Sequence, residues 1–313
     1  MFFVGSSVSG STMELSETLH KKIRYFALGT AQFGVSYGIA NQRGEVPLEG
    51  VREILATASD ARIDTLDTAI AYGTSEEKLG EIGVHNWKII TKLPKVPPDY
   101  SPLSNWVKAS VINSLKRLKL EKLYGLLLHH PQDLLEDYGE ELYSALQSLR
   151  SCGLVEKIGI SIYSPPELDQ LWGNYKFDLV QAPFNGLDQR LVTSGWLQRL
   201  KQQGVEVHGR SLFLQGLLLL SEKERPQKFQ RWQSLWTAWH TWLNEQGISP
   251  LAACLGAAWD QDQPLFHRIV VGVDSKKQLQ EIISTLETQL PSWPAHITID
   301  ELDLINPTRW NYL

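Results

Sequence analysis

The feature that most constrains the fold is a regular alternation of short β-type runs with longer helical segments. Eight apolar or β-branched runs recur along the chain, at Tyr25–Gly29, Thr65–Thr68, Lys88–Lys92, Tyr124–His129, Lys157–Ser161, Leu179–Gln181, Val205–Gly209 and Arg268–Val271. Helical periodicity marks the intervening segments, among them Leu48–Ser59, Trp106–Leu118, Glu140–Cys152, Pro166–Trp172, Gly195–Gln203, Pro250–Trp259 and Lys276–Leu286. Because eight parallel strands can close on themselves, we predict an α/β protein with one (β/α)8 TIM barrel and an active site at the C-terminal face of the strands.

The competing architecture is a doubly wound open sheet. That fold favours a glycine-rich G-x-G-x-x-G turn after the first strand. The corresponding segment here, Gly29-Thr30-Ala31-Gln32-Phe33-Gly34, lacks this pattern. The sequence therefore favours the barrel.

The chain length agrees with a single barrel domain. It has 313 residues, whereas a typical barrel needs roughly 250 and tolerates insertions. We predict a flexible N-terminal tail over residues 1–20 and the barrel over residues 21–313. The first residues lack the basic segment and the long apolar run of a signal peptide, and a true start at Met13 stays open.

Composition argues against several classes of protein. The net charge of −5 argues against a nucleic-acid surface, and no apolar run is long enough to span a bilayer. Two cysteines are too few for a disulfide framework or a cysteine-rich metal site, so we predict a cytoplasmic protein without a metal. His208, His240 and His267 are interpreted as surface or loop residues, and the oligomeric state is left open.

The predicted strand ends carry an unusual set of polar side chains. In a barrel, residues at the C-terminal ends of the strands share one active-site mouth. Here those positions hold Thr30, Asp67, Lys92, His129, Ser161, Gln181, Arg210 and Gly272. The set includes an acid, a cation and an imidazole, and Tyr72 lies five residues beyond Asp67.

These residue types fit the reduction of a carbonyl group. The ammonium of Lys92 would lower the pKa of the Tyr72 phenol, and Asp67 would hold the lysine in place. Tyr72 could then protonate a carbonyl oxygen while a hydride reaches the carbon, and His129 would orient that oxygen. The alternative for Asp67 and Lys92 is an ordinary buried ion pair, which is a poor source of stability.

The motifs resemble those of the aldo-keto reductase family. Asp67-Thr68-Ala69-Ile70-Ala71-Tyr72-Gly73 is similar to that family's D-T-A-x-x-Y-G signature, Ile90-Thr91-Lys92 to its lysine strand and Leu126–Pro131 to its histidine strand. Further similarity covers Gly153–Ser161, Val180–Asn185 and Gly209–Gly216, and the opening run resembles bacterial and cyanobacterial members. The resemblance implies the catalytic tetrad Asp67, Tyr72, Lys92 and His129.

The resemblance also implies a nicotinamide cofactor site. Ser161 and Gln181 would hold the carboxamide, and Arg210 stands where other members stack a side chain on the nicotinamide ring. The pyrophosphate would lie against backbone amides near Phe213–Leu217 and at the helix start after Gly272. The full predicted cofactor set is Thr30, Ser161, Gln181, Arg210, Ser211, Phe213, Gln215, Gly216, Gly272, Asp274 and Gln278.

Three positions depart from the family pattern. Ile162 replaces an asparagine that usually binds the carboxamide, so one cofactor anchor is expected to be missing. Asp274 and Gln278 replace residues that are commonly basic and bind the 2′-phosphate of NADPH, although Lys276 and Lys277 could compensate. NADP(H) is the expectation from the family, with NAD(H) or dual use as the alternative.

We therefore predict an NAD(P)H-dependent reductase of an aldehyde, ketone or sugar-like carbonyl. The alternative is a regulatory or scaffold protein that keeps the barrel and the cofactor but has little turnover. A metal-dependent barrel hydrolase is disfavoured because clustered ligands are missing at successive strand ends. The Trp232–Trp242 segment is interpreted as a helix that packs its tryptophan face onto the barrel rather than as a lid over the pocket.

Overall fold

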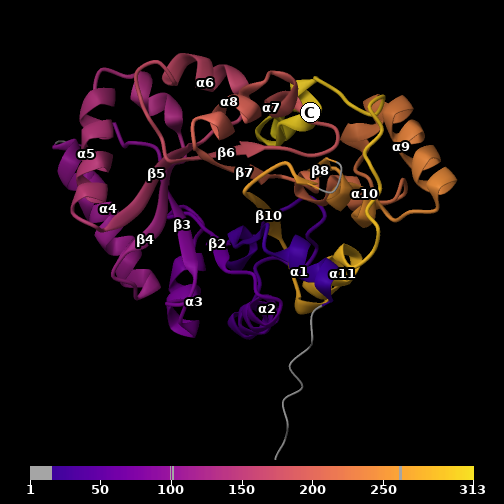
Figure 1. Ribbon diagram of the computed structural model, residues 1–313, viewed down its shortest axis with the longest axis horizontal. Helices are drawn as coiled ribbons and strands as arrows, with labels where there is room; N and C mark the ends of the chain where they lie inside the picture. The colour runs from indigo at the N-terminus through magenta and orange to yellow at the C-terminus, as the bar shows by residue number, and fades with distance from the viewer. Residues whose placement is uncertain (1–15, 99, 101, 261–262) are drawn as a thin grey trace, which may run out of the picture.

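The computed structural model describes residues 16–98, 100, 102–260 and 263–313, and its centre is a closed parallel barrel (Figure 1). The strands follow the order β1-β10-β7-β6-β5-β4-β3-β2 around the barrel, and β2 closes it against β1. The eight barrel strands are β1 (Phe26–Gly29), β2 (Thr65–Asp67), β3 (Lys88–Leu93), β4 (Leu123–Leu128), β5 (Val155–Ser161), β6 (Leu179–Pro183), β7 (Glu206–Arg210) and β10 (Arg268–Gly272). The predicted (β/α)8 barrel is confirmed.

Helices follow the strands, and most of them cover the outside of the barrel (Figure 1). They are α2 (Leu48–Asp60), α3 (Ser75–Ile82), α4 (Leu103–Leu118), α5 (Gly139–Ser151), α6 (Pro165–Leu171), α7 (Arg190–Thr193), α8 (Trp196–Gln202), α9 (Gln233–Gln246), α10 (Pro250–Gly256), α11 (Lys276–Leu286) and α12 (Leu302–Ile305). A small hairpin, β8 (Trp259–Asp260) with β9 (Gln263–Pro264), precedes the last barrel strand. No helix of the described residues is long and apolar enough to cross a membrane.

The N-terminal prediction needs one correction. Residues 1–15, including the alternative start, lie outside the described residues, but α1 (Glu17–Ile23) occupies the end of the segment predicted to be a flexible tail. Ser16 caps this helix, and Leu19 and Ile23 are buried. Apolar burial therefore anchors residues 17–20 to the barrel.

The outer helices bury one apolar stripe each. In α4 the stripe consists of Leu103, Val107, Val111, Leu115 and Leu118, a spacing of three and four residues that puts all five on one helix face. A left-handed residue at Lys119 ends the helix, and its N–H bonds the carbonyls of the last turn. The stripe joins the main hydrophobic core between strands and helices.

The tryptophan-rich helix α9 belongs to a second hydrophobic cluster. Trp236 and Trp239 are fully buried, which confirms that the tryptophans form core and not a lid. Their partners differ from the prediction, because the cluster joins α9 to Leu214, Leu217 and Leu218 in the loop after β7. The C-terminal segment supplies the rest, with Ile297, Leu304, Ile305 and Trp310, and it runs beside α9 and α10 in Figure 1.

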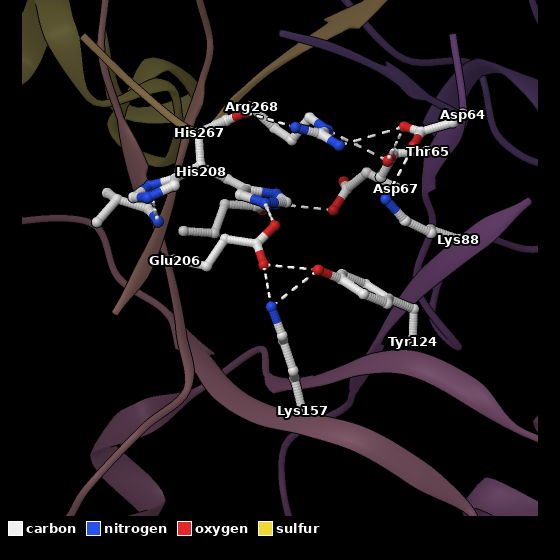
Figure 2. A network of polar contacts seen from close by, with 12 residues as sticks. Asp64, Thr65, Asp67, Lys88, Tyr124, Lys157, Glu206, His208, His267 and Arg268 are labelled. Atoms are coloured by element: carbon white, nitrogen blue, oxygen red, sulfur yellow. Dashed lines mark hydrogen bonds and ion pairs between the residues drawn. The ribbon is translucent and has the colours of Figure 1, made fainter. Parts of the chain in front are cut away.

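A polar network occupies the barrel interior, with Glu206 of β7 as its acceptor (Figure 2). Glu206 Oε2 accepts from Tyr124 Oη at 2.7 Å and from Lys157 Nζ, and Glu206 Oε1 lies 2.7 Å from His208 Nε2. His208 is fully buried, so its interpretation as a surface or loop residue was wrong. Burial by itself raises the pKa of the Glu206 carboxyl. The hydrogen bonds from His208 and Lys157 have a larger, opposite effect and hold this pKa well below its ordinary value.

Glu206→Gln should destabilise the fold. The substitution removes the negative charge that pairs with Lys157 and weakens the hydrogen bonds to a carboxyl that is 12% exposed, which should cost about 1–3 kcal/mol. Urea unfolding monitored by circular dichroism measures the change. Glu53→Gln on the exposed face of α2 is the control and should change the free energy of unfolding by less than about 0.5 kcal/mol. Equal stability of both variants would contradict the importance of the network.

Candidate active site

A buried ion pair connects the ends of β2 and β3. Lys92 Nζ lies 2.7 Å from Asp67 Oδ1 and donates to the carbonyl oxygen of Thr68 at 2.9 Å. The side chains of Lys92 and Asp67 are only 1% and 6% exposed, so water barely screens the pair. Burial lowers the pKa of the lysine, and the charge of Asp67 opposes that shift.

Tyr72 and His129 lie beside this ion pair. Lys92 Nζ is 5.2 Å from the centroid of the Tyr72 ring, and the Tyr72 and His129 rings meet edge to face with centroids 5.9 Å apart. Tyr72 stands in the loop after β2, and His129 directly follows β4. The structure therefore brings all four residues of the predicted tetrad together. His130 follows on the exposed side, with its ring 5.8 Å from that of His129.

The electrostatics differ from the sequence-based expectation at Tyr72. The pKa of the Tyr72 phenol lies above its ordinary value, mainly because the side chain is buried and secondly because of the negative charge of Asp67. The expectation from the sequence was a pKa lowered by Lys92. The phenol therefore carries its proton throughout the neutral range. Burial and the nearby Lys92 lower the pKa of His129 to about 3, so its imidazole is uncharged at neutral pH.

A cavity of about 300 Å³ begins at Asp67 and Tyr72 and extends to the start of α11. That volume is at the lower end of the range for ligand pockets. Most residues of the predicted cofactor set line it: Thr30, Arg210, Ser211, Phe213, Gln215, Gly216, Gly272, Asp274 and Gln278. The cavity therefore joins the tetrad to the predicted pyrophosphate and adenosine positions.

Ser161 and Gln181 do not line this cavity. Both are buried, and Gln181 Nε2 donates to Asp67 Oδ2 at 2.7 Å. Ser161 Oγ in turn lies 3.4 Å from Gln181 Oε1. Each carboxylate oxygen of Asp67 thus has its own partner, Lys92 on one side and Gln181 on the other.

The structure corrects the expectation for Ile162. Its side chain is fully buried in the main hydrophobic core, so it does not face the cavity. Only its backbone contributes to the site, since the carbonyl oxygen accepts from Arg210 Nη2 at 3.0 Å. Ile162 is a core residue whose side chain cannot loosen a ligand in the cavity.

The loops around the cavity combine predicted cofactor-site residues with two, Tyr37 and Asn41, that the predicted set lacks. Ser211 and Gln215 have positive φ angles of 67° and 54°, and these unusual backbone conformations shape the loop after β7. The backbone N–H of Ile39 bonds the Gln215 carbonyl oxygen at 3.1 Å, which ties the loop after β1 to this one. Tyr37 and Asn41 of that first loop also line the cavity. The loop after β1 carries no charged motif, so its place beside the cavity becomes visible only in the closed barrel.

The far end of the cavity is acidic. Asp274, Gln278 and Glu281 line it, whereas Lys276 and Lys277 are exposed outside. Gln278 Oε1 is occupied by the backbone N–H of Asp274 at 2.7 Å. Asp274 Oδ1 is buried and has no hydrogen-bond partner among the described residues, and burial raises the pKa of this carboxyl. An unpartnered buried acceptor is costly, so this end of the cavity fits a ligand with hydroxyl donors, such as a ribose.

Other chemistry finds less support within the described ranges. They contain no group of three or more histidine, cysteine, aspartate or glutamate side chains that could hold a metal ion. The site instead combines a cavity, a phenol that keeps its proton and a buried ion pair at the C-terminal ends of barrel strands. This arrangement lies where (β/α)8 barrel enzymes place their active sites.

Comparisons with known proteins identify the family. The model of the Aldo/keto reductase family matches residues 26–301, so the chain belongs to this family. Its members use a nicotinamide cofactor to reduce carbonyl compounds. No curated protein matches the sequence.

Solved structures share the fold. PA4992 of Pseudomonas aeruginosa, assigned to the aldo-keto reductases, is 22% identical with a TM-score of 0.61, and the match covers 84% of this chain and 89% of that one. The aldo-keto reductase AKR11C1 from Bacillus halodurans, in its holo form, is 18% identical with a TM-score of 0.67 and coverage of 87% and 89%. At this identity the likeness establishes the architecture only.

Ile162→Asn should destabilise the protein without changing cofactor binding. The amide would lie unpaired in the core, which costs about 1–3 kcal/mol, in addition to lost apolar burial of about 2 kcal/mol. Thermal unfolding and a titration with NADH measure the two effects, and Ile162→Val is the conservative control. A tighter NADH complex of the asparagine variant would show that position 162 faces the cofactor.

Proposed function

We propose that this chain is an NAD(P)H-dependent reductase that converts an aldehyde, ketone or sugar-like carbonyl to the alcohol. The observation that carries the proposal is that Asp67 and Tyr72 line one end of a cavity, with Lys92 paired to Asp67 and the His129 ring against that of Tyr72. Among the described residues, Asp274 Oδ1 at the other end has no hydrogen-bond partner, which suits a ligand with hydroxyl groups such as a dinucleotide. A bound nicotinamide would supply the hydride.

The side chains act on the carbonyl oxygen. Tyr72 is the proton donor, because burial keeps its hydroxyl protonated and it lines the cavity. His129 is uncharged, so one ring nitrogen can donate a hydrogen bond that fixes the oxygen. As the carbonyl π pair moves to oxygen, that oxygen takes the Tyr72 proton. The nearby Lys92 ammonium stabilises the phenolate left behind, and Asp67 holds Lys92 in place.

Tyr72→Phe should abolish carbonyl reduction and spare cofactor binding. Loss of a general acid lowers kcat/KM by roughly 100- to 10,000-fold, whereas the NADH and NADPH dissociation constants should stay within about threefold. Steady-state reduction of aromatic aldehydes and a fluorescence titration measure the two quantities. Tyr312→Phe, at a position 88% exposed, is the matched control. Retained reduction by the Tyr72→Phe variant would refute the assignment of the proton donor.

The second candidate function is a regulatory or scaffold protein of the same fold. Such a protein would bind the cofactor as tightly as a reductase does, but the wild type would reduce none of the aldehydes in a broad panel. The buried ion pair and the adjacent phenol favour the enzyme, because cofactor binding alone gives no reason to bury Lys92 with Asp67 beside Tyr72. The absence of nucleic-acid partners and the cytoplasmic location stay predictions.

For the cofactor, the acidic far end favours the alternative, NAD(H), over the family expectation of NADP(H). A 2′-phosphate next to Asp274 and Glu281 would be repelled, and Lys276 and Lys277 do not line the cavity. A ribose hydroxyl would instead give Asp274 Oδ1 the donor that it lacks. Arg43, whose charge acts on Asp274, is the cation that could still accommodate a phosphate.

Asp274→Asn should shift the preference toward NADPH. The variant removes repulsion of the 2′-phosphate and weakens the bond to a ribose hydroxyl, so the ratio of the NADPH and NADH dissociation constants should fall roughly tenfold. Parallel titrations with both cofactors measure the ratio. Asp60→Asn, on the exposed end of α2, is the control for the loss of one negative charge. An unchanged ratio would place Asp274 away from the ribose.

A further inference from the structure

Arg210 is a cation at the active-site end of the cavity that has no acidic partner among the described residues. It is the last residue of β7 and lines the cavity together with Tyr72 and Asp67. Within the described ranges, no carboxylate lies within ion-pair distance of its guanidinium. The other buried cation of the site, Lys92, is paired with Asp67 at 2.7 Å.

Uncharged groups hold the guanidinium in place. Arg210 Nη2 donates to the Ile162 carbonyl oxygen at 3.0 Å, Nη1 donates to Ser211 Oγ at 3.2 Å, and the Tyr163 ring centroid lies 4.7 Å from Cζ. These contacts use two of the five N–H donors of the side chain. The arginine is therefore oriented, and donors remain for a ligand in the cavity.

The charges around Tyr72 do not cancel. Lys92 and Arg210 are positive, Asp67 is negative, and His129 is uncharged because burial lowers its pKa to about 3. The charge of Arg210 also acts on Tyr72, and on Tyr37 of the loop after β1. The reacting end of the cavity thus carries one net positive charge, which attracts an anion.

We propose that Arg210 binds a carboxylate on the carbonyl substrate, so that the enzyme prefers aldehydes or ketones that carry a carboxylate group. A guanidinium presents two parallel N–H groups that match the two oxygens of a carboxylate. A single net positive charge suits a monoanion better than a phosphate dianion. This inference rests on the proposed reductase function and specifies its substrate class.

The rival role for Arg210 is support of the cofactor, as the family position suggests. The two roles predict different losses. A group that stacks on the nicotinamide affects every substrate and the cofactor equally, whereas a carboxylate-binding group affects only substrates with that charge. Matched pairs of substrates therefore separate them.

The first experiment compares carboxybenzaldehydes with their methyl esters, using the 2-, 3- and 4-substituted rings to vary the distance between aldehyde and charge. We expect the wild type to prefer at least one acid over its ester. Arg210→Gln should lower kcat/KM for that acid roughly 10- to 100-fold, the effect of one or two charge-assisted hydrogen bonds. The loss of kcat/KM for that acid should exceed the loss for its methyl ester at least tenfold, and the NADH dissociation constant should change by less than about threefold.

Two further variants complete this design. Arg210→Lys keeps a point charge without the planar fork and should recover part of the preference. Arg52→Gln removes an exposed cation of α2 that pairs with Glu49, and the preference should be unchanged. Equal losses for acids and esters, or a weakened NADH complex of Arg210→Gln, would assign Arg210 to the cofactor and overturn the inference.

The second experiment does not depend on turnover. Isothermal titration calorimetry measures binding of the three hydroxymethylbenzoates, the alcohol products, and of their methyl esters to the protein with and without NADH. We expect the wild type to bind at least one acid and Arg210→Gln to bind it at least tenfold more weakly. Equal binding of the acids and esters by the wild type, or equal binding of the acids by both proteins, would refute the carboxylate site. Acid binding without any aldehyde reduction would refute the reductase proposal alone.

Discussion

The site depends on the buried contact between Lys92 and Asp67. An ammonium with 1% exposure has lost its hydration, so its charge persists only through the carboxylate and the Thr68 carbonyl oxygen. Both partners come from neighbouring parallel strands, whose register pairs Asp67 with Ile90 and so brings Lys92 within reach. Removal of either partner would leave an isolated charge beside Tyr72. The register of β2 and β3 thus sets the charge next to Tyr72.

Much of the fold followed from periodicity. All eight barrel strands were predicted to within two residues at either end, because β-type runs separated by amphipathic helices leave few alternative architectures. The sequence also predicted that Asp67, Lys92 and His129 lie close together, since the carboxyl ends of parallel strands share one face of the barrel. These successes come from local patterns repeated around a closed sheet.

The errors concern side-chain direction and long-range contacts. His208 looked like a surface residue, but it faces the barrel interior two positions from Glu206 in the same strand. Ile162 occupies a motif position, yet its side chain packs in the core and only its carbonyl oxygen reaches the site. Gln181 bonds Asp67 across the barrel from β6 to β2, a contact between residues 114 positions apart that no local pattern encodes. The roles of such residues are set by the closed barrel rather than by neighbours in sequence.

The tryptophan cluster has a consequence for the order in which the site is completed. Leu214, Leu217 and Leu218 of the cavity loop share one core with Ile297, Leu304 and Trp310. The ribosome makes the latter residues after every strand of the barrel. When the last barrel strand has been made, the loop after β7 therefore has α9 to pack against but still lacks the C-terminal part of its cluster. The cofactor-side wall thus depends on residues made after every strand that carries the tetrad.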